Sequence, residues 1–249
     1  MLGETRAEAA SRRALIETLP IGDMPHAELL GRVRDRLCAD ALAMGLTLVV
    51  SDNWCELEAI NRRNLASWVP ILHRAASLPS FWVGAVDTAG DGDVVAVQAG
   101  LLVDCRAHSF ADHLAALELF YDDPADAPAG ERCFVGDGPA HETFGPVCWI
   151  AAGWNRSDWR GRGLFHLVGR AVRLLSWARW QPSWWCGVVT PDVVPAWATK
   201  RAGPRHLDRR PTILYRQAGV ERPPLHFLRL GRGGVQQDFG RLVHGRPHQ

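Results

Sequence analysis

Apolar residues recur along this chain at two spacings, one typical of helices and one typical of strands. In the segment 27–44 they recur every three or four residues, on one helical face (Leu30, Val33, Leu37, Ala41 and Met44). The clearest helix is expected from Gly163 to Ala178, where eight apolar residues form one stripe. Further helices are expected at 54–74, 109–121 and 193–201. Short apolar or β-branched runs predict strands at 46–50, 81–86, 94–103, 147–152, 184–190, 212–215 and 225–230.

The order of these elements predicts an α/β or α+β sheet protein. It is expected to form one domain with an N-terminal helical extension over residues 1–45. A loop rich in Gly and Asp, 87–93, joins two strands as a hairpin. The stretch 122–145 is rich in Pro, Gly, Ala and Asp, and we expect it to be an insertion or a lid.

Composition excludes several classes of protein. With 47% apolar and 22% charged residues in 249, the chain matches an ordinary globular protein. No apolar run reaches the roughly 18–20 residues of a membrane span, and residues 1–13 lack the apolar core of a secretory signal. The six cysteines are scattered without a Cys-x-x-Cys pair, so we expect no metal site. We expect a reduced protein in the cytoplasm.

The net charge of +1 hides an asymmetry along the chain. From Ile150 onward there are 17 basic and 5 acidic residues, whereas the first 149 residues are acidic on balance. This distribution indicates either one cationic and one anionic ligand or merely solvated surfaces. All basic residues except Lys200 are arginines, which suits phosphate binding and also fits a GC-rich bacterial genome.

The most informative segment joins the strand at 147–152 to the helix at 163–178. Its glycines allow a tight turn and a close approach of the backbone to a ligand. The first N–H groups of the following helix lack partners within that helix and favour an anion, as do nearby arginines. We therefore expect a pyrophosphate site here, or else a loop capped for structural reasons. The candidate binding residues are Trp154, Arg156, Arg160, Gly161, Arg162, Gly163 and Leu164.

Two other nucleotide-binding loops do not fit this segment. It lacks the G-x-x-x-x-G-K-[ST] pattern of a Walker A loop. A dinucleotide-binding fingerprint would need a third glycine at position 166, which is a histidine here.

The segment resembles the acyl-CoA loop of the GNAT superfamily of N-acyltransferases, which has the form Arg-x-x-Gly-x-Gly/Ala between a strand and a helix. Arg160 and Gly163 match that pattern, whereas Phe165 stands at its last small position. Downstream, Lys200-Arg-Ala-Gly203 resembles the end of a short family helix. The resemblance implies a mixed, mostly antiparallel twisted sheet flanked by helices. It covers roughly residues 46–230 as the acyltransferase domain, with a tail at 231–249.

The resemblance also implies a function: transfer of an acyl group from acetyl-CoA or another acyl-CoA to a small-molecule amine by direct attack. The pantetheine would pair with the backbone of residues 149–154, and the phosphates would lie on residues 160–164. Many family members place a tyrosine acid four residues before the helix-ending glycine. That position is Thr199 here, so Tyr215 or a water would protonate the leaving thiolate.

The general base and the acceptor site are less determined. His141 and Glu142 precede the strand where the family often places a carboxylate, and they fit an exposed loop pair equally well. Glu56 fits either an amine-binding side chain or a solvated charge. Cys186 is expected to be a buried structural thiol. The eight tryptophans between 149 and 197 fit a broad apolar pocket or core packing.

Two further functions compete with the acyltransferase. One is a catalytically inactive GNAT-like protein that binds a ligand or partner, which the Thr199 and Phe165 departures favour. The other is a nucleic-acid module, which the spread of arginines among Gly and Pro and the near-zero net charge disfavour. We expect a small-molecule amine as partner, no nucleic acid and no membrane. The sequence leaves the oligomeric state open between a monomer and a homodimer.

Overall fold

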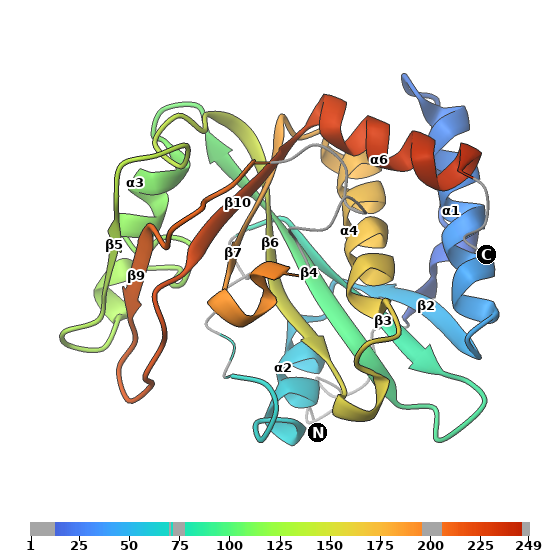
Figure 1. Ribbon diagram of the computed structural model, residues 1–249, viewed down its shortest axis with the longest axis horizontal. Coiled ribbons are helices and arrows are strands. Elements are labelled where there is room, and N and C mark those ends of the chain that lie inside the picture. Colours follow the sequence, from blue (N-terminus) through green and yellow to red (C-terminus); the bar gives the residue numbers. More distant parts are fainter. Residues whose placement is uncertain (1–12, 70, 72–77, 196–205, 246–249) are drawn as a thin grey trace, which may run out of the picture.

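A computed structural model describes residues 13–69, 71, 78–195 and 206–245 (Figure 1). Its centre is an eight-stranded sheet in the order β1-β2-β3-β4-β6-β7-β10-β8. The strands are β1 (Ala14–Leu15), β2 (Leu46–Ser51), β3 (Ser80–Asp87), β4 (Val94–Cys105), β6 (Gly145–Asn155), β7 (Trp184–Val189), β8 (His206–Leu207) and β10 (His226–Gly231). Every neighbouring pair is antiparallel except β6 and β7, which run parallel. The expected mixed, mostly antiparallel sheet is confirmed.

Helices cover both faces of this sheet. They are α1 (Ala27–Leu42), α2 (Trp54–Arg63), α3 (Phe110–Ala115), α4 (Leu164–Trp180) and α6 (Arg232–His244). Short 3-10 turns lie at Ile16–Thr18, Pro124–Asp126, Ser157–Trp159 and Pro191–Val193. One buried cluster combines side chains of α1, α4 and α6 with the sheet, and a second combines those of α2 and α3 with its other face.

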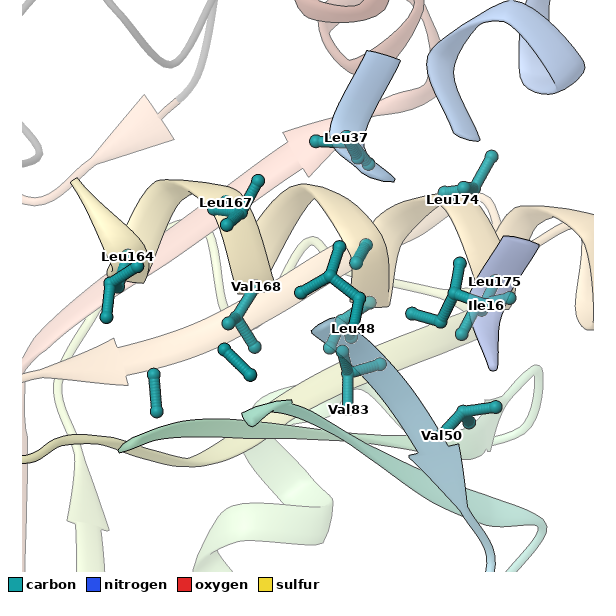
Figure 2. Close-up of a cluster of buried hydrophobic side chains, with 14 of the residues drawn as sticks. Ile16, Leu37, Leu48, Val50, Val83, Leu164, Leu167, Val168, Leu174 and Leu175 are labelled. Atoms are coloured by element: carbon teal, nitrogen blue, oxygen red, sulfur yellow. The ribbon is translucent and has the colours of Figure 1, made fainter. Parts of the chain in front are cut away.

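The strand residues are apolar on both sides because both faces of the sheet are covered. In β2, Leu48 and Val50 join the α4 cluster, whereas Val49 between them joins the α2–α3 cluster. Figure 2 shows α4 lying over Leu48, Val50 and Val83, with Leu37 of α1 beside it. Seven of the eight residues of the predicted apolar stripe of α4 are buried, and the last, Ala178, is half-buried.

Two further strands form a separate pair. β5 (Arg132–Val135) and β9 (Ile213–Arg216) are antiparallel partners, and Figure 1 shows them beside α3, on the opposite side of the molecule from α1 and α4. The stretch 122–145 is therefore not a free lid. It contains β5, which pairs with β9, and its residue Cys133 is buried.

Several expected boundaries move. α2 ends at Arg63 rather than near residue 74, and α3 ends at Ala115 because Leu117 has a positive φ of 63°. The expected tail from residue 231 contains α6, whose Val235 and Phe239 are fully buried. The expected helix at 193–201 and the start of the N-terminal extension fall partly outside the described residues. No helix in the described part of the chain is long and apolar enough to cross a membrane.

A buried ionic cluster fastens α6 to α4. The fully buried Asp238 carboxylate accepts two hydrogen bonds from Arg170, at 3.0 and 2.8 Å, and one from the buried Arg173, at 3.1 Å. Burial alone would raise the pKa of this carboxyl, but the Arg170 hydrogen bonds and the two positive charges lower it. Asp238 therefore stays ionised and compensates the Arg173 guanidinium inside the fold.

Asp238→Asn should lower the free energy of unfolding by about 3–5 kcal/mol, because it leaves Arg173 as an uncompensated buried charge. Urea unfolding measures the change. Asp40→Asn is the matched control, since it breaks only the surface pair between Arg36 and Asp40 and should cost at most about 1 kcal/mol. Equal losses in the two variants would contradict a stabilising role for the buried cluster.

Candidate functional site

The parallel strands β6 and β7 separate soon after they begin to pair. They pair over three residues each, Val147–Trp149 with Trp184–Cys186. Beyond these pairs β6 bonds only to β4 and β7 only to β10 within the described chain. From Ile150 and Gly187 onward, the two edges that face each other therefore carry backbone groups without a strand partner.

A cavity of about 290 Å³ occupies this opening. We call it the β6–β7 cavity. Its wall comes from β6 (Ile150–Gly153), β7 (Cys186–Val189), the first turn of α4 (Phe165) and the β9 side (Ile213, Tyr215, Arg222, Leu225). Trp68, Leu114, Phe120 and Trp149 add apolar surface from the α2–α3 side. The cavity therefore connects the beginning of α4 with the β5–β9 pair.

A bulge shapes the β6 wall. Gln98 of β4 stands opposite both Ala152 and Gly153, because the register shifts by one residue there. Ala152 takes a positive φ of 53°, a conformation that costs a non-glycine residue about 1–2 kcal/mol. A side chain at Gly153 would meet the Phe165 ring at 3.2 Å. Backbone strain beside a cavity is a frequent feature of binding sites.

Two buried polar atoms of the cavity wall lack hydrogen-bond partners among the described residues. They are Gln98 Oε1 and Trp149 Nε1, on side chains that are 4% and 5% exposed. An unpaired buried polar group costs free energy. A ligand with polar groups would supply such partners.

The loop between β6 and α4 presents a row of donors. Within the described chain, the N–H groups of Gly161, Arg162, Gly163 and Leu164 donate to no acceptor, and Gly163 caps α4 without a side-chain hydrogen bond. Gly161 and Gly163 have φ values of 79° and 81°, which explains the glycines found in the sequence. Free amides at the start of a 17-residue helix favour an anion.

The arginines of this loop differ in availability. Arg156 pairs with Asp158 at 2.9 Å and with Asp91 at 3.1 Å, so its charge is largely compensated. The Arg162 guanidinium lies 4.5 Å from the Trp159 ring centre. Arg160 is exposed and has no ion pair with another described residue. Arg160 and Arg162 therefore carry the positive charge left for a ligand.

The remaining predicted cofactor residues are buried. Trp154 stacks on Trp68 at 5.2 Å, and its Nε1 donates to Ser67 Oγ at 3.1 Å. Leu164 belongs to the hydrophobic cluster under α4. The side chains of both residues hold the loop in place, whereas the Leu164 N–H remains available to a ligand.

The β9 side of the cavity contains a polar network that the sequence analysis missed. Tyr215 and Tyr121 each donate to one oxygen of Glu131, both at 2.5 Å. The Tyr215 ring stacks on Phe120 at 4.4 Å and lies 5.7 Å from the Arg222 guanidinium. Burial raises the pKa of Tyr215, and the Glu131 carboxylate raises it further. The bond from Tyr215 to Glu131 joins residues 84 positions apart, so no local pattern reveals the network.

His141 and Glu142 lie outside this cavity. Both are exposed, and Glu142 Oε2 lies 3.4 Å from Arg229 Nη2. A general base must reach the amine directly or through one water. Neither side chain is part of the cavity wall, so their catalytic role stays a prediction.

Glu56 also points to a structural partner. Its Oε1 accepts from Arg13 Nε at 2.7 Å, and the residue is not part of the cavity wall. Cys186 does line the cavity, but burial raises the pKa of its thiol well above the usual range. It is accordingly a poor nucleophile. Thr199, Trp197 and Lys200–Gly203 lie outside the described residues.

The described residues contain no group of three His, Cys, Asp or Glu that could hold a metal ion. The cavity combines an apolar channel, free strand edges, a loop with unpaired amides at one end, and a tyrosine and an arginine at the other.

Comparison with known proteins adds structural neighbours only. No model of a known family matches the sequence, and no curated protein matches it. One similar solved structure is a candidate acetyltransferase from Acinetobacter baylyi ADP1, with 12% identity and a TM-score of 0.33 over 91% of this chain and 95% of that chain. Another is a GCN5-related N-acetyltransferase from Kribbella flavida, with 13% identity and a TM-score of 0.34 over 76% of this chain and 99% of that one. Both neighbours are named as acetyltransferases, the second as a GCN5-related N-acetyltransferase, and both have low sequence identity to this chain.

Tyr215 should ionise above the ordinary tyrosine pKa of about 10, because burial and Glu131 both disfavour the phenolate. The chain has two tyrosines, so Tyr121→Phe leaves Tyr215 as the sole reporter. Near-ultraviolet phenolate absorbance measures the titration, and Glu131→Gln in the same background should lower the pKa. Ionisation near pH 10 before unfolding would contradict the described network.

Proposed function

We propose that this chain is an acyl-CoA-dependent N-acyltransferase of the GNAT type that acts on a small-molecule amine. The observation that carries the proposal is the early separation of the parallel pair β6–β7, with an anion-binding helix start at the same opening. Phe165 in the first turn of α4 and Gly153 of β6 both line the cavity. The loop amides that precede Phe165 therefore lie next to the apolar channel.

The residues present fit the parts of an acyl-CoA. The pyrophosphate matches the free amides of residues 161–164 and the charges of Arg160 and Arg162. The amides of the pantetheine match the unpaired edges of β6 and β7, which would accept it as an added strand. The apolar wall excludes water around the acyl group.

An acyl-CoA supplies an activated thioester carbonyl. In the proposed reaction the neutral amine of the acceptor attacks that carbonyl, the new C–N bond forms and the C–S bond breaks. The electron pair leaves with sulfur, and the proton lost by nitrogen reaches the thiolate through a protein group or water. The unpaired edge of β6 would orient the carbonyl, and the cavity would bring the two reactants together.

Tyr215 is poorly suited to protonate the leaving thiolate. The Tyr215 proton is engaged by Glu131, and a raised pKa makes the phenol a reluctant acid. This observation favours a second candidate, a GNAT-like protein that binds CoA without catalysis. Release of free thiol from acetyl-CoA in the presence of amines separates the two, because the second candidate binds CoA and releases none. An acyltransferase would find its co-substrate in the cytoplasm, which is the location we propose.

CoA should raise the melting temperature of the protein, and two variants should weaken its binding at separate places. Arg160→Ala removes one charge-assisted contact and should weaken CoA binding about 10–150-fold. Gly187→Val places a branched side chain beside the Ile150 carbonyl, because a Cβ added at Gly187 would lie 3.5 Å from that oxygen, and it should block the channel while suiting a strand. Isothermal titration calorimetry measures both effects.

Arg210→Ala is the control for these variants, because it removes an exposed arginine outside the cavity wall. It should bind CoA as the parent does. If Arg160→Ala and Gly187→Val also bind CoA like the parent, the acyl-CoA assignment fails.

A further inference from the structure

Resting on the proposed function, we propose that the β9 end of the cavity selects the acceptor: a small amine with an apolar or aromatic body and a carboxylate, which Arg222 binds. An aromatic amino acid has this chemistry. The proposal concerns the end of the cavity opposite the α4 loop, where no phosphate site is expected.

Arg222 is a charged residue with unused donors in an apolar wall. It is half-buried, lines the cavity and donates from Nε to Gln217 Oε1 at 2.5 Å. No described carboxylate lies within ion-pair distance of its guanidinium. Its Nη groups donate to no acceptor among the described residues, and a ligand carboxylate would match this fork.

Glu131, the carboxylate near Arg222, does not form an ion pair with it. Both of its oxygens accept short hydrogen bonds from tyrosines, so the carboxylate is held by Tyr121 and Tyr215. Burial lowers the pKa of Arg222, although the nearby Tyr215 and Glu131 oppose the effect. A partly desolvated arginine of this kind gains more from an anionic ligand than an exposed one does.

The surrounding side chains define the rest of the acceptor. Phe120 packs on Tyr215 at 4.4 Å and on Trp149 at 5.5 Å, which makes one aromatic wall. Trp149 Nε1 is a buried donor without a described partner and would donate to an oxygen of the ligand. Ile213 and Leu225 complete an apolar surface. An apolar body with one acidic group fits these features.

The charge of the wall argues against a polycationic acceptor. Among the described residues that line the cavity, Arg222 is the charged one, and no Asp or Glu is present. The acidic residue expected to bind a cationic amine, Glu56, is paired with Arg13 instead. A polyamine would meet a positive charge here without a compensating carboxylate.

The test uses three matched probes that need no catalysis: 3-phenylpropanoate, its neutral amide, and 3-phenylpropylamine. Calorimetric titration into the full chain, saturated with CoA, should show binding of the carboxylate and at least tenfold weaker binding of the other two. Arg222→Met should weaken carboxylate binding about 10–150-fold, and Arg222→Lys should retain part of it. Arg216→Met is the control, because Arg216 is exposed on the same strand and is not part of the cavity wall.

The outcomes separate this inference from the proposed function. Equal binding of the acid and the amide, or an Arg222→Met variant that binds the acid like the parent, overturns the inference while CoA binding stands. Binding of the acid to the CoA-free protein but not to the CoA-saturated protein also overturns it, because Arg222 would then serve the co-substrate. If CoA does not bind but the acid still binds through Arg222, the acyltransferase proposal fails and the anion site remains. If Arg222→Met does not fold, Arg222→Gln and Arg222→Lys give the same comparison.

Discussion

The candidate site depends on the separation of β6 and β7 after three paired residues on each strand. A parallel pair in the middle of a sheet would normally bond along its whole length, because buried backbone groups need partners. Here β7 continues along β10, and β6 continues along β4 with a bulge at Ala152–Gly153. The separation leaves two facing strand edges inside the molecule, and a ligand that resembles a strand is the natural partner for them.

The loop after β6 brings the start of α4 to the same cavity. β6 ends at Asn155, the loop turns at two glycines with positive φ, and α4 begins at Leu164 beside the cavity. The buried stripe of α4 and the Asp238 cluster hold that helix against the sheet, so its free amides have a fixed direction. A rigid core thus positions an anion site and an apolar channel next to each other.

The parts of the fold that rest on local pattern could be predicted, and the parts that rest on distant contacts could not. The α4 stripe, the glycine loop and the strand before it were predicted because periodicity and turn chemistry are encoded within a few residues. β5 escaped prediction because its four residues are stabilised by β9, about 80 positions later. α6 lies in the expected tail, where two glycines in its first turn weaken the helical pattern, yet Val235, Asp238 and Phe239 anchor it in the core. For the same reason the roles of Glu131 and Arg222 could not be predicted, because they depend on contacts that both residues make with the distant Tyr215.

Amide hydrogen exchange with and without saturating CoA tests the central claim most directly, because it reads the strand edges and the loop amides separately. The account predicts added protection in two places, residues 150–153 of β6 and residues 161–164 before and at the start of α4, with β2 and β3 unchanged. Binding of CoA without protection at either place, or protection centred elsewhere in the chain, would contradict it.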